Sequence, residues 1–241
     1  MGRLFQFCIL LILFILPFSR PSLEEIYGIN FVGNWTETEK RYVYQAISHV
    51  SIALQRQVNY PYPCKTNAEL FKEVFGITKD NPLIIEKRYS TYTGAIVVNY
   101  YHIVFYNFFP SKDRSIRLIV HELGHVFEHN IFLNTEEKIP REVLKETWIT
   151  DKTFPRRTFP NNYYGYYGLC YDWQMSCHKT PAEEFADMFI GWTYDKWETS
   201  PQGIIRKQWM DTNMPIFINA STPKLSQCSI LYPLLINPIP Y

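Results

Sequence analysis

Three observations in the sequence predict a single α+β domain. Two helical segments in the second half of the chain carry histidines and carboxylates at regular spacing. A run of β-branched and aromatic residues, broken by turn residues, precedes them and indicates a small, mainly antiparallel sheet. Without an apolar leader at the start, roughly 220 residues remain, which is enough for one well-packed domain and awkward for two.

The elements of the first half follow from apolar spacing and turn residues. Thr36 to Glu39 resembles a capping box, and the apolar residues after it predict a helix that ends near Gln57. A short helix is expected from Asn67 to Phe75, where Gly76 stops it. Three strands are then expected, from Leu83 to Ser90, from Gly94 to Asn99 and from His102 to Phe108.

The second half is predicted to contain two main helices. Ser111 is a suitable N-cap for the first of them, and residues 130 to 179 are expected to be irregular apart from a helix at Arg141 to Thr147. Thr180 followed by Pro181 opens the second helix. The predicted apolar faces are Ile119, Val120, Leu123, Val126 and Phe127 on the first helix, and Phe185, Met188, Phe189 and Trp192 on the second.

Residues 1–22 are typical of a secretory signal peptide. Arg3 supplies the positive charge, and the stretch from Leu4 to Phe18 is almost wholly apolar. That stretch is shorter than the ~20 residues that span a bilayer, which favours a signal over an anchor. The cleavage site is weak, so an uncleaved N-terminal anchor stays open. We therefore expect a secreted domain over residues 23–241, with no other membrane span.

Cysteine usage agrees with export. Cys8 lies in the leader, which leaves an even number of four cysteines for two disulfides. We favour pairing Cys170 with Cys177 and Cys64 with Cys228, although four cysteines allow three pairings.

Charge and sequons limit the choice of partners. The formal net charge of +1 gives no case for binding to nucleic acid or to an anionic membrane. Asn34 and Asn219 each begin an N-glycosylation sequon. We expect a monomer whose partner is a peptide or protein substrate.

The segment His121-Glu122-Leu123-Gly124-His125 carries the chemistry. Residues four apart lie on one face of a helix, so the two histidines can bind one Zn²⁺ together. Glu122 lies about 100° round the helix, where it can reach the attacking water without being a ligand. Gly124 is a poor helix former, which indicates that another segment passes close by.

A catalytic zinc site needs a third protein ligand. The candidates are Glu183, Glu184 and Asp187, at the start of the second helix. Glu183 and Asp187 are four residues apart on one face, so Glu183 can bind zinc while Asp187 accepts a hydrogen bond from a histidine ligand. Glu183 has an alternative interpretation, because Thr180 to Glu183 also forms a capping box. Glu184 stays open as the ligand, and so does a site without a third carboxylate.

These two segments resemble the gluzincin type of zinc metallopeptidase, and within it the lethal-factor-like branch. The resemblance covers His-Glu-Leu-Gly-His and the later Glu-Glu-Phe-Ala-Asp helix, and it implies a zincin-like fold. The resemblance implies that the three zinc ligands are His121, His125 and Glu183. Glu122 matches the general base, and Asp187 matches the carboxylate behind a histidine ligand.

The family often uses a tyrosine upstream of the third ligand to stabilise the oxyanion, and Tyr166, Tyr167 and Tyr171 are the candidates here. The resemblance implies hydrolysis of peptide bonds by a zinc-activated water, with Glu122 as general base. An extended substrate would lie along the strand nearest the site, which is Gly94 to Asn99 or His102 to Phe108. Two alternatives are a catalytically silent binding domain of the same fold and a secreted structural or adhesion module in which the motif is accidental.

Overall fold

The computed structural model describes residues 21–58, 65–91, 94–107, 111–134, 139–150, 156–158, 164–166, 175 and 180–222. The first 20 residues of the expected signal peptide and all five cysteines lie outside these ranges. Among the described helices, none combines the length and the apolar composition that a membrane span requires. Both sequon asparagines are exposed.

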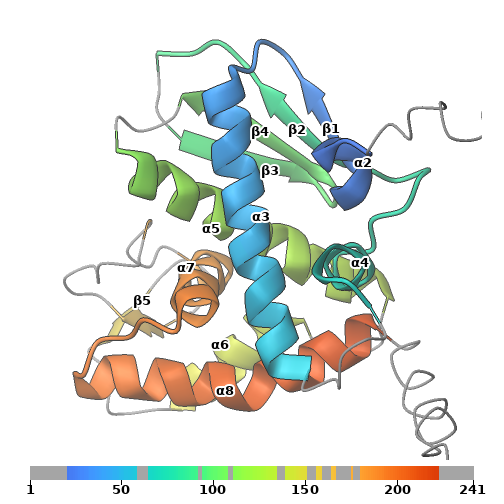
Figure 1. Ribbon diagram of the computed structural model, residues 1–241. Coiled ribbons are helices and arrows are strands. Elements are labelled where there is room, and N and C mark those ends of the chain that lie inside the picture. Colours follow the sequence, from blue (N-terminus) through green and yellow to red (C-terminus); the bar gives the residue numbers. More distant parts are fainter. Residues whose placement is uncertain are drawn as a thin grey trace, which may run out of the picture.

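The described part of the chain is a mixed helix and strand structure with a four-stranded sheet, as the α+β prediction requires (Figure 1). It begins with α2 (Leu23–Tyr27), β1 (Ile29–Val32) and the long helix α3 (Glu37–Val58). The predicted capping box is present at the start of α3, where the Glu39 N–H donates to the Thr36 hydroxyl at 3.2 Å. Neither α2 nor β1 was expected, because their segments are too short for a clear period.

The next elements are α4 (Asn67–Val74), β2 (Leu83–Lys87), β3 (Gly94–Asn99) and β4 (His102–Asn107). All four agree with the predicted segments to within three residues. Gly76 ends the α4 turn with a φ of +63°, the left-handed conformation that glycine adopts without strain.

The expectation of an antiparallel-rich sheet was wrong. The strand order is β1-β2-β4-β3, in which β1 pairs with β2 and β2 with β4 in parallel, and only β3 and β4 are antiparallel. The three predicted strands do alternate in direction along the chain. However, β4 lies between β2 and β3 and therefore pairs with β2 as well. Because β2 and β4 run in the same direction, this pairing is parallel. This order leaves β3 at the edge of the sheet.

The second half contains α5 (Lys112–Asn134), α6 (Pro140–Thr150), α7 (Pro181–Tyr194) and α8 (Pro201–Ser221). Two short antiparallel strands, β5 (Arg156–Thr158) and β6 (Tyr164–Tyr166), lie between α6 and α7. Residues 130–179 are therefore less irregular than expected, since α5 continues to Asn134 and β5 and β6 follow. The sequence did not predict α8, because Pro215 inside it is a residue that normally breaks a helix.

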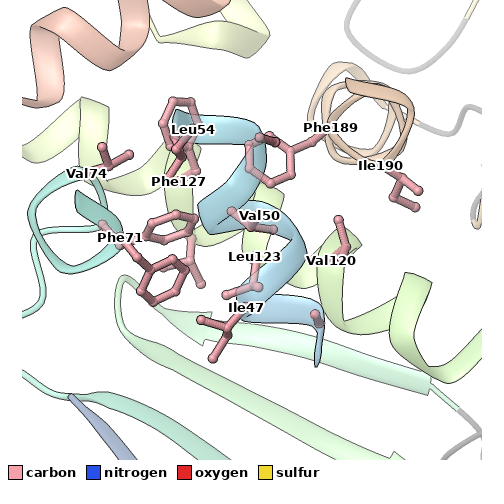
Figure 2. Packing of buried hydrophobic residues seen from close by; sticks show 14 of the residues in the cluster. Ile47, Val50, Leu54, Phe71, Val74, Val120, Leu123, Phe127, Phe189 and Ile190 are labelled. Carbon is pink, nitrogen blue, oxygen red and sulfur yellow. The ribbon is translucent and has the colours of Figure 1, made fainter. Parts of the chain in front are cut away.

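The hydrophobic core lies between the sheet and the helices. Figure 2 shows Ile47 and Val50 of α3 near Leu123 and Phe127 of α5, with Phe189 of α7 on the other side. Every residue of the predicted apolar faces of α5 and α7 is buried. Helix α5 contacts α3, the strand β3 and α7 in this core, and these contacts fix it both to the sheet and to α7.

Candidate metal centre

The core sets the rotation of α5 about its own axis. Ser111 accepts the Arg114 N–H at 3.5 Å as the expected N-cap, and the apolar face that follows is buried completely. Its opposite side therefore carries the two histidines, one helical turn apart, with their ring centroids 4.9 Å apart. His121 and Glu122 are each only 4% exposed, so this part of α5 is covered by neighbouring elements.

Helix α7 packs against the histidine side of α5. The Thr180 hydroxyl accepts the Glu183 N–H at 3.2 Å and Pro181 occupies the first turn, as predicted. Gly124 lies where the two helices come close, because a Cβ on it would be only 3.1 Å from the Ala186 α-carbon. The segment expected to pass near this glycine is thus α7, and it brings its first turn to the histidines.

His121, His125 and Glu183 meet in space. One carboxylate oxygen of Glu183 is 3.2 Å from His121 Nε2, and the other is 3.7 Å from His125 Nε2. The three potential ligand atoms all lie within 4.8 Å of one another, so the group could hold a metal ion. The carboxylate of Glu183 thus faces the histidines, while only its backbone N–H takes part in capping the helix.

Asp187 lies behind His121. Its Oδ1 is 2.9 Å from His121 Nδ1, and the same oxygen accepts the backbone N–H of Met175 at 2.8 Å. A carboxylate oxygen that faces a ring nitrogen accepts a hydrogen bond from it, so Nδ1 carries a proton. Nε2 is then the ring nitrogen of His121 that faces Glu183.

Burial and neighbouring charges give the three titratable groups of α5 very different pKa values. Burial, assisted by the charge on His121, lowers the pKa of His125 to about 3, so this imidazole is neutral at pH 7. Burial opposes the charged form of His121, but hydrogen bonds to Asp187 and Glu183 outweigh it and raise the pKa well above its ordinary value. Burial also raises the pKa of Glu122 to about 7, where a carboxyl group can both accept and release a proton.

Glu184, the alternative ligand, points away from the histidines. Its carboxylate lies 2.6 Å from Arg206 Nε on α8, and both side chains are fully buried. The structure therefore does not bring Glu184 together with the histidines, because one step along the helix turns the side chain by about 100°. Glu184 instead joins α7 to α8.

One further histidine lies on the same helix, and one of the three tyrosine candidates lies in a described strand. His129 lies one turn beyond His125, and its ring packs edge-on against Tyr100 with a centroid distance of 5.5 Å. Tyr166 ends β6, and Tyr167 and Tyr171 lie outside the described residues, so the role of a tyrosine at the oxyanion stays a prediction.

A cavity of about 440 Å³ opens beside the histidines and the edge strand. Gly94 to Val97 of β3 form one wall, α5 forms the floor, and Ala182 and Glu183 stand at the α7 end. Of the two strands proposed to lie nearest the site, β3 is the one that lines this cavity. Ile96 is half exposed there, at 50%.

Two contacts at the site were not predicted. Arg141 of α6 lines the cavity and pairs with the buried Glu128, and the Met175 N–H supports Asp187. Glu128 follows His125 by three residues on α5, but its partner is 13 residues further along the chain. No local spacing rule connects such a pair, so the sequence offers no signal for it.

Comparisons with protein families, characterised proteins and solved structures found no match to this chain. Its function must therefore be inferred from the geometry of the site, and the combination of His121, His125 and Glu183 is its most specific feature.

Proposed function

We propose that this protein is a secreted zinc-dependent metallopeptidase of the gluzincin type, acting as a monomer on peptide bonds. The observation that carries the proposal is the meeting of two histidines and one carboxylate from two helices beside a cavity, with Glu122 next to them. The signal peptide, the two disulfides and the glycans expected from the sequence belong to the same proposal.

The donor set fits Zn²⁺. Two imidazole nitrogens and one carboxylate oxygen are the protein ligands of many catalytic zinc sites, which keep a further position open. His125 is neutral, as a ligand must be, and the contact with Asp187 orients His121 in the way that supporting carboxylates orient zinc ligands. When bound, Zn²⁺ would supply Lewis-acid polarisation of a carbonyl and a lower pKa for water.

Glu122 is proposed to move the proton. It lies on α5 between the two histidines in sequence, is buried, and has a pKa of about 7 without metal. A carboxylate there can accept the proton of the attacking water and pass it to the leaving amine. Asp187 keeps the imidazole of His121 in one tautomer and orientation throughout, because the hydrogen bond between them is buried.

The edge strand β3 is proposed to hold the substrate. An extended peptide can add to the free edge of a sheet through main-chain hydrogen bonds, and β3 is both an edge strand and a wall of the cavity. This placement would lay the scissile bond over the histidines, and the pocket walls would then select side chains.

The test combines metal content with peptide cleavage. The purified protein should hold one zinc per chain, and Glu122→Gln should keep the metal but lose about 10²–10⁴-fold in kcat, because an amide cannot accept the proton. Glu37→Gln is the matched control, since Glu37 is 85% exposed on α3. A chain that holds less than half an equivalent of metal after reconstitution, or a Glu122→Gln variant as active as the parent, would refute the proposal. Zinc without cleavage would favour the silent binding domain.

A further inference from the structure

Arg141 places a positive charge in the cavity about one helical turn beyond the histidines. It is the second residue of α6 and lines the cavity together with His125 and His129. Among the described residues that form the walls, no other is an arginine or lysine. The cavity lining therefore combines one guanidinium with two carboxyl groups, of which Glu183 belongs to the group that could hold a metal ion.

A buried carboxylate holds Arg141 in place from behind. Glu128 on α5 is fully buried, and its Oε2 lies 2.8 Å from Arg141 Nη2. Its other oxygen accepts the Arg141 backbone N–H at 2.7 Å. The side chain of Arg141 itself is 35% exposed. Because Glu128 fixes both the backbone and one end of the guanidinium, the exposed part of the fork is presented to the cavity with little freedom left to lose on binding.

A guanidinium has five N–H donors, and one carboxylate does not satisfy them all. Peptides offer one strong planar partner for such a fork, a carboxylate. His129 lies four residues beyond His125, about 6 Å along the helix axis, and Glu128 is at nearly the same level. An extended peptide advances by about 3.3 Å per residue, so this distance corresponds to roughly two residues of substrate.

We propose that Arg141 forms a carboxylate-binding subsite, so that the substrates are peptides with a carboxylate one to three residues from the scissile bond. The carboxylate comes from an acidic side chain or from a free C-terminus. This inference rests on the proposed peptidase function and adds the substrate class to it. Arg141 then determines specificity, and Glu128 positions it.

The first experiment compares matched peptides on the zinc-loaded parent protein. A random peptide library identifies a cleaved sequence, which is then made with Glu or Gln at each of three positions on either side of the scissile bond. A second series ends two residues after that bond with a free carboxylate or an amide. We expect roughly tenfold higher kcat/KM for the carboxylate at one position in one series, because hydrogen bonds between charged groups are about that strong. The series that responds identifies the source of the carboxylate.

Three variants test whether Arg141 causes the preference for a carboxylate. Arg141→Gln should lower the ratio of kcat/KM between the carboxylate peptide and its uncharged match from about tenfold to about one, because the amide carries no charge to pair with the carboxylate. Glu128→Gln should weaken the preference, because a neutral amide holds the guanidinium of Arg141 less firmly than the carboxylate does. Arg41→Gln is the control, because Arg41 is an exposed arginine on α3 away from the cavity. Unfolding curves of all four proteins show whether the variants are folded.

Binding provides a readout that does not depend on turnover. On zinc-loaded Glu122→Gln protein, the carboxylate peptide should bind about tenfold more tightly than its uncharged match, and the added Arg141→Gln change should abolish the difference. Cleavage without any preference for a carboxylate in the parent overturns this inference and leaves the peptidase function standing. Absence of cleavage with an intact binding preference overturns the peptidase function and leaves the subsite. Equal binding of both peptides overturns the subsite, whatever the variants do.

Discussion

Glu183 and Glu184 are adjacent in the chain, yet their replacement should have opposite consequences. Glu183 faces the two histidines, and its side chain is 34% exposed. In Glu183→Ala the metal loses one of three ligands, so we expect less than half an equivalent of bound zinc. The helix cap survives, because the Thr180 hydroxyl accepts a backbone N–H that alanine retains. The unfolding free energy of the metal-free protein should therefore change by less than about 1 kcal/mol.

Glu184→Ala should instead leave the zinc ligands in place and destabilise the fold. The removed carboxylate is 2.6 Å from Arg206 Nε, and both side chains have no exposed surface. Removing one partner of such a buried pair costs about 3–5 kcal/mol, because the remaining charge loses the carboxylate that compensates it. In a domain of this size that corresponds to a Tm lower by roughly 10 °C. Zinc content by elemental analysis and urea unfolding of the metal-free proteins measure the two effects separately.

A double variant separates the loss of an ion pair from the loss of packing. Glu184→Met combined with Arg206→Met replaces the buried charges with apolar side chains of similar length, which is often neutral or stabilising. We expect its unfolding free energy to lie within about 2 kcal/mol of the parent, with one zinc bound. Full zinc retention in Glu183→Ala, together with depletion in a folded Glu184 variant, would move the ligand one residue along α7 and refute the assignment.

Three further predictions test the surroundings of the site and the sign of a pH effect. Asp187→Ala should weaken zinc binding by about 10–100-fold in a chelator competition without abolishing it, because His121 loses its orienting partner; an unchanged affinity would contradict that role. Gly124→Ala should lower the unfolding free energy by about 1 kcal/mol, because its Cβ would lie 3.1 Å from the Ala186 α-carbon on α7. A higher unfolding free energy would contradict this close approach, since alanine favours a helix over glycine where there is room for its methyl group. Burial opposes ionisation of Glu39, but hydrogen bonds from Lys87 and Thr36 outweigh it and hold the pKa below 4.5. Its contribution to stability is therefore present above that pH and lost as the pH falls through the lowered pKa, so Glu39→Gln should destabilise the protein at about pH 7, and the difference from the parent should shrink as the pH falls below 4.5.

The first part of the site could be predicted from the sequence because it is local. His121, Glu122 and His125 belong to one helix, and the spacing of four residues determines that both imidazoles share a face. The apolar residues around them show which side is buried, and the structure confirms this for every one.

The choice between Glu183 and Glu184 could not be made in the same way. Helix α7 is buried on all sides from Glu184 to Thr193, so its apolar residues do not mark a single core face. Its rotation is set by contacts with four other helices, and the close approach at Gly124 is one of them. Only the packed structure shows which carboxylate turns to the histidines and which one meets Arg206.

In the sheet, the positions of the strands could be predicted from the sequence, but their order could not. Alternation and turn residues located three of its strands, because side-chain direction within a strand is a local property. The order of the strands depends on which edges meet in space, and β4 takes the place beside β2 that a simple meander would give to β3.

The sequence by itself therefore determined the helices from α3 to α7, three strands, the buried faces and the two-histidine motif, all of which depend on contacts within a few residues. Tertiary structure alone decided that Glu183 completes the group, that Asp187 supports His121 and that β3 borders the cavity. It also brought Arg141 to Glu128. The side-chain contacts join residues that lie 13 to 66 positions apart in the chain, and their geometry follows from how the helices pack rather than from any local period.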